Sequence, residues 1–185
     1  MMKIIGAIFL VGLGVLFRTL WHVAPNVEYV TAASLLAGAY LGRKYAVLVP
    51  FLIMVLSDTL IGNTNIFIFT WSGYLLIGLI SQIGLIGKTG KIWRATGLGI
   101  AASLFFYLYT NFGVWLLDSW EMYPRTLAGL IDCYIMGLPF LKLNLLGNLF
   151  FVPVSFGIVE GVKAVLIYGM IKISWTKNKS QINPL

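Results

Sequence analysis

Six apolar segments, separated by polar turns, run through the chain. They span residues 4–20, 29–41, 45–61, 66–86, 95–117 and 148–173. A helix needs about 20 residues to cross a hydrocarbon core of about 30 Å, and all but the second segment approach that length. Backbone groups cannot stay unpaired in lipid, and the two-residue alternation of barrel strands is missing, so each segment should be helical. The pattern predicts an all-α membrane protein with six transmembrane helices.

The stretch between the fifth and sixth segments, residues 118–147, is predicted not to cross the membrane. Its start is polar, and Pro124 and Pro139 interrupt it. Residues 127–138 within it are mostly apolar but too few to span. We expect them to form a short extra helix that lies on, or dips into, one face of the membrane.

Basic residues fall mainly on one side of the predicted membrane. The chain has 13 Lys and Arg against 6 Asp and Glu. With the N-terminus inside, the cytoplasmic side holds Lys3, Arg43, Lys44, Lys88, Lys91, Arg94, Lys172, Lys177 and Lys179, and the opposite side holds Arg18, Arg125 and Lys142. Cytoplasmic loops are enriched in basic residues, so both termini should be cytoplasmic. Residues 1–175 then form one transmembrane domain and residues 176–185 a short basic cytoplasmic tail. The positive charge reflects topology and requires no nucleic acid as a partner.

Several kinds of chemistry are excluded by missing residues. Cys133 is the only cysteine and His22 the only histidine, so an internal disulfide and a two-histidine metal site are excluded. Residues 84–89 resemble the end of a phosphate-binding P-loop, but that motif needs a glycine where Gln82 stands and a preceding strand. The chain has no Gly-x-Ser-x-Gly elbow, and its predicted spans do not hold two carboxylates at the same depth, so the residues of an intramembrane protease are missing. We therefore expect no enzyme activity, catalytic residue, cofactor or metal.

A cluster of polar and aromatic residues lies toward the predicted outer face. Tyr107, Asn111 and Trp115 are spaced by four residues and so share one helix face. An amide flanked by aromatic rings suits a ligand that is partly flat and partly polar. The alternative is an interfacial aromatic belt, but Asn111 lies inside the span and needs a hydrogen-bond partner. The expected ligand-binding residues are Asp58, Asn63, Trp71, Tyr107, Asn111, Trp115 and Tyr123.

Two further features indicate close packing or contact with a partner. Ala33, Ser34, Ala37 and Gly38 form a stripe of small residues on the second segment, which lets another helix approach closely. That helix could belong to the same bundle or to a partner subunit, and we assign the stripe to partner docking. Glu160 and Lys163 share a face of the last segment and form either a structural pair or a contact with a partner.

Several polar-aromatic strings of this chain are similar to those of a known family. They lie at residues 25–30, 37–42, 49–50, 56–62, 110–115, 123–130 and 137–140. Their order and spacing resemble the substrate-binding (S) components of energy-coupling-factor (ECF) importers of bacteria. At position 148 this chain has asparagine, where aspartate is more usual in that family.

The resemblance implies a six-helix bundle in the bacterial cell membrane that binds a vitamin or similar micronutrient. It also implies partners, namely a transmembrane coupling subunit and two ATPase subunits that supply the energy. The alternative is a membrane scaffold similar to the six-helix shape-determining proteins of the MreD type. An S component predicts ATPase partners, whereas a scaffold predicts a cytoskeletal one.

Overall fold

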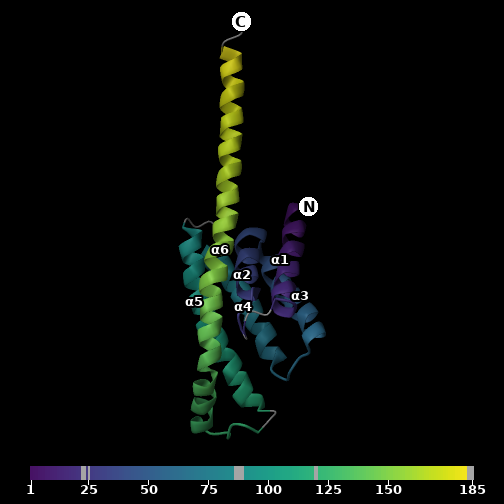
Figure 1. Ribbon diagram of the computed structural model, residues 1–185, viewed down its shortest axis with the longest axis vertical. Coiled ribbons are helices and arrows are strands. Elements are labelled where there is room, and N and C mark those ends of the chain that lie inside the picture. Colours follow the sequence, from purple (N-terminus) through teal and green to yellow (C-terminus); the bar gives the residue numbers. More distant parts are fainter. Residues whose placement is uncertain (22–23, 25, 86–89, 119–120, 183–185) are drawn as a thin grey trace.

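The computed structural model describes residues 1–21, 24, 26–85, 90–118 and 121–182, and over these residues it is helical, without strands. Its elements are α1 (Met2–Thr19), α2 (Val30–Leu36), the π-helical turn η1 (Ala37–Leu41), α3 (Arg43–Ile61), α4 (Phe67–Leu85), α5 (Lys91–Leu117) and α6 (Leu127–Ile182) (Figure 1). Four of them, α1, α3, α5 and α6, are long and apolar enough to cross a membrane. The predicted all-α fold is confirmed over these residues, and the four long apolar helices suggest a membrane protein.

Glycines set the ends of α3. Gly42 precedes the helix with a φ of 106°, and Gly62 follows it with a φ of 85°. Glycine adopts these conformations without the steric cost that a side chain imposes. The chain therefore turns sharply on both sides of a 19-residue helix, and α3 packs beside α4 and α1.

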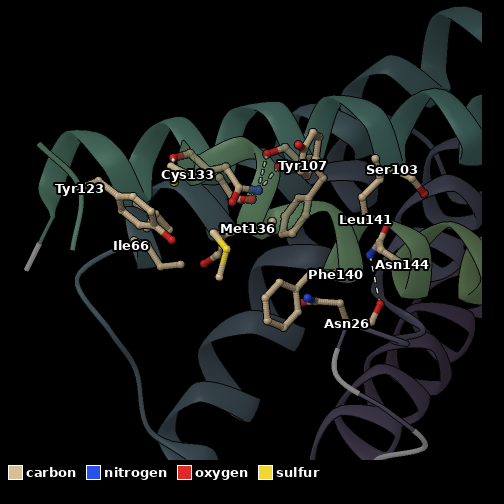
Figure 2. A pocket seen from close by; sticks show the side chains of 16 residues that line it. Asn26, Ile66, Ser103, Tyr107, Tyr123, Cys133, Met136, Phe140, Leu141 and Asn144 are labelled. Carbon is tan, nitrogen blue, oxygen red and sulfur yellow. Dashed lines mark hydrogen bonds between the residues drawn. The ribbon is translucent and has the colours of Figure 1, made fainter. Parts of the chain in front are cut away.

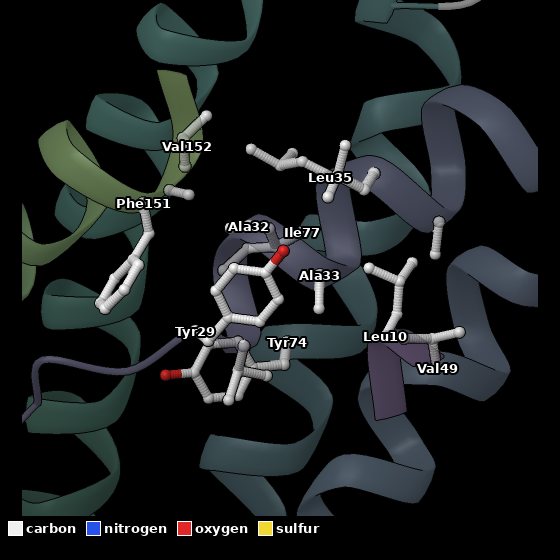
Figure 3. Close-up of a cluster of buried hydrophobic side chains, with 14 of the residues drawn as sticks. Leu10, Tyr29, Ala32, Ala33, Leu35, Val49, Tyr74, Ile77, Phe151 and Val152 are labelled. Carbon is white, nitrogen blue, oxygen red and sulfur yellow. The ribbon is translucent and has the colours of Figure 1, made fainter. Parts of the chain in front are cut away.

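The second apolar segment is the centre of the bundle. All seven residues of α2 are buried, and the helix contacts α1, α3, α4, α5 and α6. Around it, Leu10, Val49, Ile77 and Phe151 close the core (Figure 3). At 1.5 Å per residue, α2 and η1 together are about 18 Å long, which is too short to cross a core of about 30 Å. This segment is a buried core helix rather than a full-length span.

The last helix corrects the prediction for residues 118–147. A helix begins at Leu127 as expected, but it continues without a break through the sixth apolar segment to Ile182. The prediction of a separate short helix over residues 127–138 is therefore wrong. The predicted cytoplasmic tail, residues 176–185, is helical as far as Ile182. Pro139 and Pro153 lie inside α6, where neighbouring helices can compensate for the missing backbone donors. With 56 residues, α6 is about 84 Å long.

The helices alternate in direction. The start of α1 and the C-terminal part of α6 lie at the same end of the bundle, and α6 projects well beyond it (Figure 1). The turn between α3 and α4, the end of α5 and the start of α6 lie at the opposite end. Below, the end where α1 begins is called the terminal end, and the other is called the loop end.

Candidate functional site

A cavity of about 270 Å³ lies between α5 and α6 toward the loop end. The start of α4 and the segment before α2 close its other sides (Figure 2). Its walls are Asn26, Ile66, Thr70, Ser103, Phe106, Tyr107, Thr110, Asn111, Val114, Tyr123, Cys133, Met136, Gly137, Phe140, Leu141 and Asn144. The size suits a small organic molecule.

The lining is polar but uncharged. Amides, hydroxyls and phenols alternate with aromatic and aliphatic side chains, and none of the described residues of the wall is Asp, Glu, Lys or Arg. An ion without a counter-charge would lose its hydration here and gain no opposite charge in return. A neutral molecule with a few hydrogen-bonding groups would lose much less. The cavity therefore favours an uncharged, partly apolar ligand.

Asn111 is held between the two helices that form the cavity. Its Nδ2 donates to the carbonyl oxygen of Tyr107, one turn earlier on α5, at 2.8 Å. Gly137 of α6 faces it so closely that a Cβ atom there would lie 2.4 Å from Asn111 Oδ1. Only a residue without a side chain lets α6 approach the amide in this way. Gly137 is thus the residue that brings Asn111 and α6 together.

Two further bonds fix the register of α5 against α6 at the cavity. The hydroxyl of Tyr107 donates to the carbonyl oxygen of Tyr134 at 2.6 Å. The thiol of Cys133 donates to the carbonyl oxygen of Asn111 at 3.3 Å. Both link adjacent turns of the two helices. They make the wall around Asn111 a preorganised surface rather than a gap between loosely packed helices.

A chain of side-chain amides runs from the inner end of the cavity, at Asn144, to Asn148 behind its wall. Asn148 Nδ2 donates to Ser103 Oγ at 2.8 Å and to Asn144 Oδ1 at 3.1 Å. Asn144 Nδ2 in turn donates to the carbonyl oxygen of Asn26 at 3.2 Å. Asn26 lies outside the helices, and its φ is 61°. Irregular backbone within a helical bundle is tolerated where it lines a cavity, as it does here. A carboxylate at position 148 could not donate these two bonds.

Tyr123 closes the cavity at the loop end. Its backbone N–H donates to Asp118 Oδ2 at 3.3 Å, and that of Met122 donates to Asp118 Oδ1 at 2.9 Å, so one carboxylate orders the turn. Burial, with smaller effects from Cys133, Asp118 and Asp132, raises the pKa of the Tyr123 phenol. Tyr123 therefore keeps its proton at neutral pH and can donate a hydrogen bond to a ligand.

Asp58 and Trp71 belong to a different structure, a buried network around Arg18. Arg18 Nη1 lies 2.8 Å from Asp58 Oδ1, and Arg18 Nε lies 3.3 Å from Glu28 Oε1. The indole of Trp71 donates to Asp58 Oδ2 at 2.6 Å, and the hydroxyl of Tyr74 donates to Glu28 Oε2 at 3.2 Å. The side chains of Arg18, Glu28 and Asp58 are 11%, 13% and 6% exposed. The network joins α1, α3, α4 and the segment before α2.

Comparison with known proteins gives a family. Residues 1–169 match the model of a family of unknown function, DUF6580. The chain belongs to this family. No curated protein and no solved structure matches the chain.

The seven predicted ligand-binding residues of the DUF6580 chain fall into three groups. Tyr107, Asn111 and Tyr123 line the cavity. Asp58 and Trp71 join the Arg18 network instead. The remaining two lie outside the cavity wall. Asn63 is exposed and accepts a hydrogen bond from the backbone of Thr64 at 2.7 Å, and the Trp115 indole donates to the carbonyl oxygen of Pro124 at 3.1 Å.

The stripe of small residues packs inside the DUF6580 bundle. Ala33, Ser34 and Ala37 are fully buried, and Gly38 is buried as well. A Cβ atom on Gly38 would lie 1.5 Å from Ser81 Oγ of α4, and the carbonyl oxygen of Gly38 accepts a hydrogen bond from the Gln82 amide. These contacts are with the chain's own helices. They fit the first of the two possibilities given by the sequence, in which the approaching helix belongs to the same bundle. We therefore assign the stripe to internal packing in place of partner docking.

Sequence reasoning missed the amides of the inner end. Asn144 and Asn148 are one helical turn apart within an apolar stretch, and buried amides in such a stretch need partners. That spacing is the signal that could have identified them. Asn26 carries no comparable signal, because its place in the wall depends on the path of the segment before α2.

Among the described residues, no group of three or more His, Cys, Asp and Glu side chains could hold a metal ion. The P-loop-like residues 86–89 and His22 lie outside the residues that the structure describes.

Proposed function

We propose that this chain is the substrate-binding subunit of an ECF-type importer. In this role it captures a small uncharged nutrient, such as a vitamin, from outside the bacterial cell membrane. Uptake is driven by a transmembrane coupling subunit and two ATPase subunits. The observation that carries the proposal is the uncharged, polar-aromatic cavity of about 270 Å³ between α5 and α6.

The cavity suits capture and release. Amides and hydroxyls offer a neutral ligand hydrogen bonds of modest net strength, about 0.5–1.5 kcal/mol each. Phe106, Phe140 and Met136 supply apolar contact area. Such a site can hold a nutrient without covalent chemistry and can release it once the wall moves. A subunit of this kind needs a partner for energy, because binding alone cannot concentrate the nutrient.

The orientation follows from the charges. With the terminal end in the cytoplasm, the basic residues obey the enrichment expected of cytoplasmic loops, and the cavity lies toward the outside. In a Cys133→Ala background, Asn63→Cys at the loop end should react with an impermeant thiol reagent on whole cells. Lys44→Cys, at the other end of α3, should react only after the membrane is opened. Labelling of both sites from outside contradicts this orientation.

The decisive experiment isolates the tagged chain from its native membranes. An S component should bring a coupling subunit and two different ATPases with it, and solvent extraction should release a neutral small molecule. Isolation with cytoskeletal proteins and without ATPases would instead favour an MreD-type scaffold.

A further inference from the structure

A second cavity lies on the side of the bundle, between α1 and α6. It measures about 340 Å³, and η1 and the end of α2 form its floor. Within the described residues, α1 packs against α2, η1 and α3 but makes no close backbone approach to α6. The two helices therefore leave a groove between them, here called the lateral groove.

The lateral groove is apolar along its length. Gly6, Phe9 and Leu13 of α1 face Ile158 and Val159 of α6 across it. Its polar side chains include Tyr29 and Ser155, whose hydroxyls bond to each other at 3.1 Å. Phe9 is 63% and Ile158 62% exposed, so the groove is open on the side that faces the hydrocarbon core in a membrane. An apolar chain can enter it there.

The end of the groove near the termini is basic. Lys163 Nζ lies 3.8 Å from the centre of the Tyr40 ring and 3.3 Å from Glu160 Oε1, which also accepts a hydrogen bond from Tyr40 at 2.6 Å. Lys91 Nζ lies 4.5 Å from the same ring centre. Lys3 stands three residues before Gly6, on the same face of α1. Three lysine ammonium groups against the single carboxylate of Glu160 give this end of the groove a net positive charge.

We propose that the lateral groove binds an acyl chain of an anionic phospholipid, with the lipid phosphate beside Lys163 and Lys3. The apolar walls match a hydrocarbon tail, and the positive charge lies only at the end where a headgroup would be. An apolar helix of a partner protein would fit the walls, but it carries no full negative charge to match the ammonium groups at one end. Basic pockets at the cytoplasmic ends of membrane helices are suited to anionic headgroups. This inference does not depend on the proposed transport function.

The test uses native mass spectrometry of the purified chain with phosphatidylglycerol or phosphatidylcholine of identical acyl chains. The wild type should bind phosphatidylglycerol more tightly, and Lys3→Gln and Lys163→Gln should each weaken this binding about fivefold, because a lysine near an anionic headgroup contributes about 1 kcal/mol. The double variant Arg43→Gln/Lys44→Gln, changed at exposed residues of α3, should retain the preference.

A second pair of variants tests the groove itself. Val159→Trp should fill it and remove both lipids, whereas Val154→Trp, on α6 but outside the groove, should not. Equal binding of the two lipids by the wild type overturns the proposal, as does phosphatidylglycerol binding that is unchanged in the lysine variants. If Val159→Trp does not fold, the lysine variants decide alone. Crosslinking of Ile158→Cys to another membrane protein, with no lipid retained, would assign the groove to a partner helix.

Discussion

The Arg18 network and the cavity lie near the same end of the bundle but use polar residues in opposite ways. The network concentrates charge, and the carboxylate oxygens of Asp58 and Glu28 are engaged by Arg18, Trp71 and Tyr74. The cavity has no charged residue in its described wall, and its amides and phenols face an open space. In a low-dielectric interior, charges are kept where they can be paired within the chain. Uncharged groups remain for a ligand.

This difference separates two roles that look alike in the sequence. Asp58 and Asn111 are both polar residues toward the C-terminal ends of apolar segments. The first ties α1, α3 and α4 together, and the second lies between α5 and α6 at the cavity. We therefore expect changes in the network to affect stability first, and changes in the cavity to affect ligand retention first.

Removal of the central charge of the network should have the largest effect. Arg18→Leu leaves Glu28 and Asp58 buried without their counter-ion, and breaking a buried ion pair in this way costs about 3–5 kcal/mol. The variant should show a large loss of thermal stability in detergent and a low yield, whereas Arg18→Lys, which keeps the charge, should be intermediate. Melting of Arg18→Leu at the wild-type temperature would mean that the network does not hold the helices together.

A smaller effect is expected where α5 and α6 meet. Gly137→Ala places a methyl group against the Asn111 amide and should destabilise the protein by about 1–3 kcal/mol through overpacking. The double variant Asn111→Ala/Gly137→Ala removes the clash and should recover most of the melting temperature without restoring ligand retention. A double variant no more stable than Gly137→Ala would show that the strain arises elsewhere.

The smallest effect should come from the rim of the network. Tyr74→Phe removes one hydrogen bond to Glu28, which keeps its ion pair with Arg18. The expected loss is about 1.5 kcal/mol, the low end for a hydrogen bond to a charged group, because the ion pair remains. It should appear as a modest shift in thermal melting, with ligand retention unchanged. A loss as large as that of Arg18→Leu would indicate that Tyr74, rather than the arginine, organises the network.

Much of the helical pattern could be predicted, because apolar runs and helix spacing are local properties. The face shared by Tyr107 and Asn111 follows from a spacing of four residues, and the structure places both in the cavity wall. The continuity of α6 could not be predicted in this way. Pro139 indicates a break, whereas α6 runs through it as one helix packed along α5, and that packing is a contact between helices that no local pattern gives.

The assignment of Asp58 shows where local reasoning fails. Its partner Arg18 lies 40 residues earlier in the chain, and the sequence gives no spacing rule for a contact between helices. In the sequence, Arg18 enters only the count of basic residues on each side of the predicted membrane. The length of the second segment was a usable signal, since apolar stretches of 10–14 residues are more often buried core helices than membrane spans.

The central claim, that the uncharged cavity between α5 and α6 holds a neutral ligand, is tested most directly by native mass spectrometry of three proteins. They are the wild type, Asn111→Leu and Asn63→Leu, isolated from the same host membranes. Loss of the buried amide should weaken binding by about 1–3 kcal/mol, or roughly fivefold to over a hundredfold, whereas Asn63 is exposed and outside the cavity. We expect a retained neutral molecule on the wild type and on Asn63→Leu, and its loss from a folded Asn111→Leu. Equal retention by all three proteins would contradict a ligand site at Asn111.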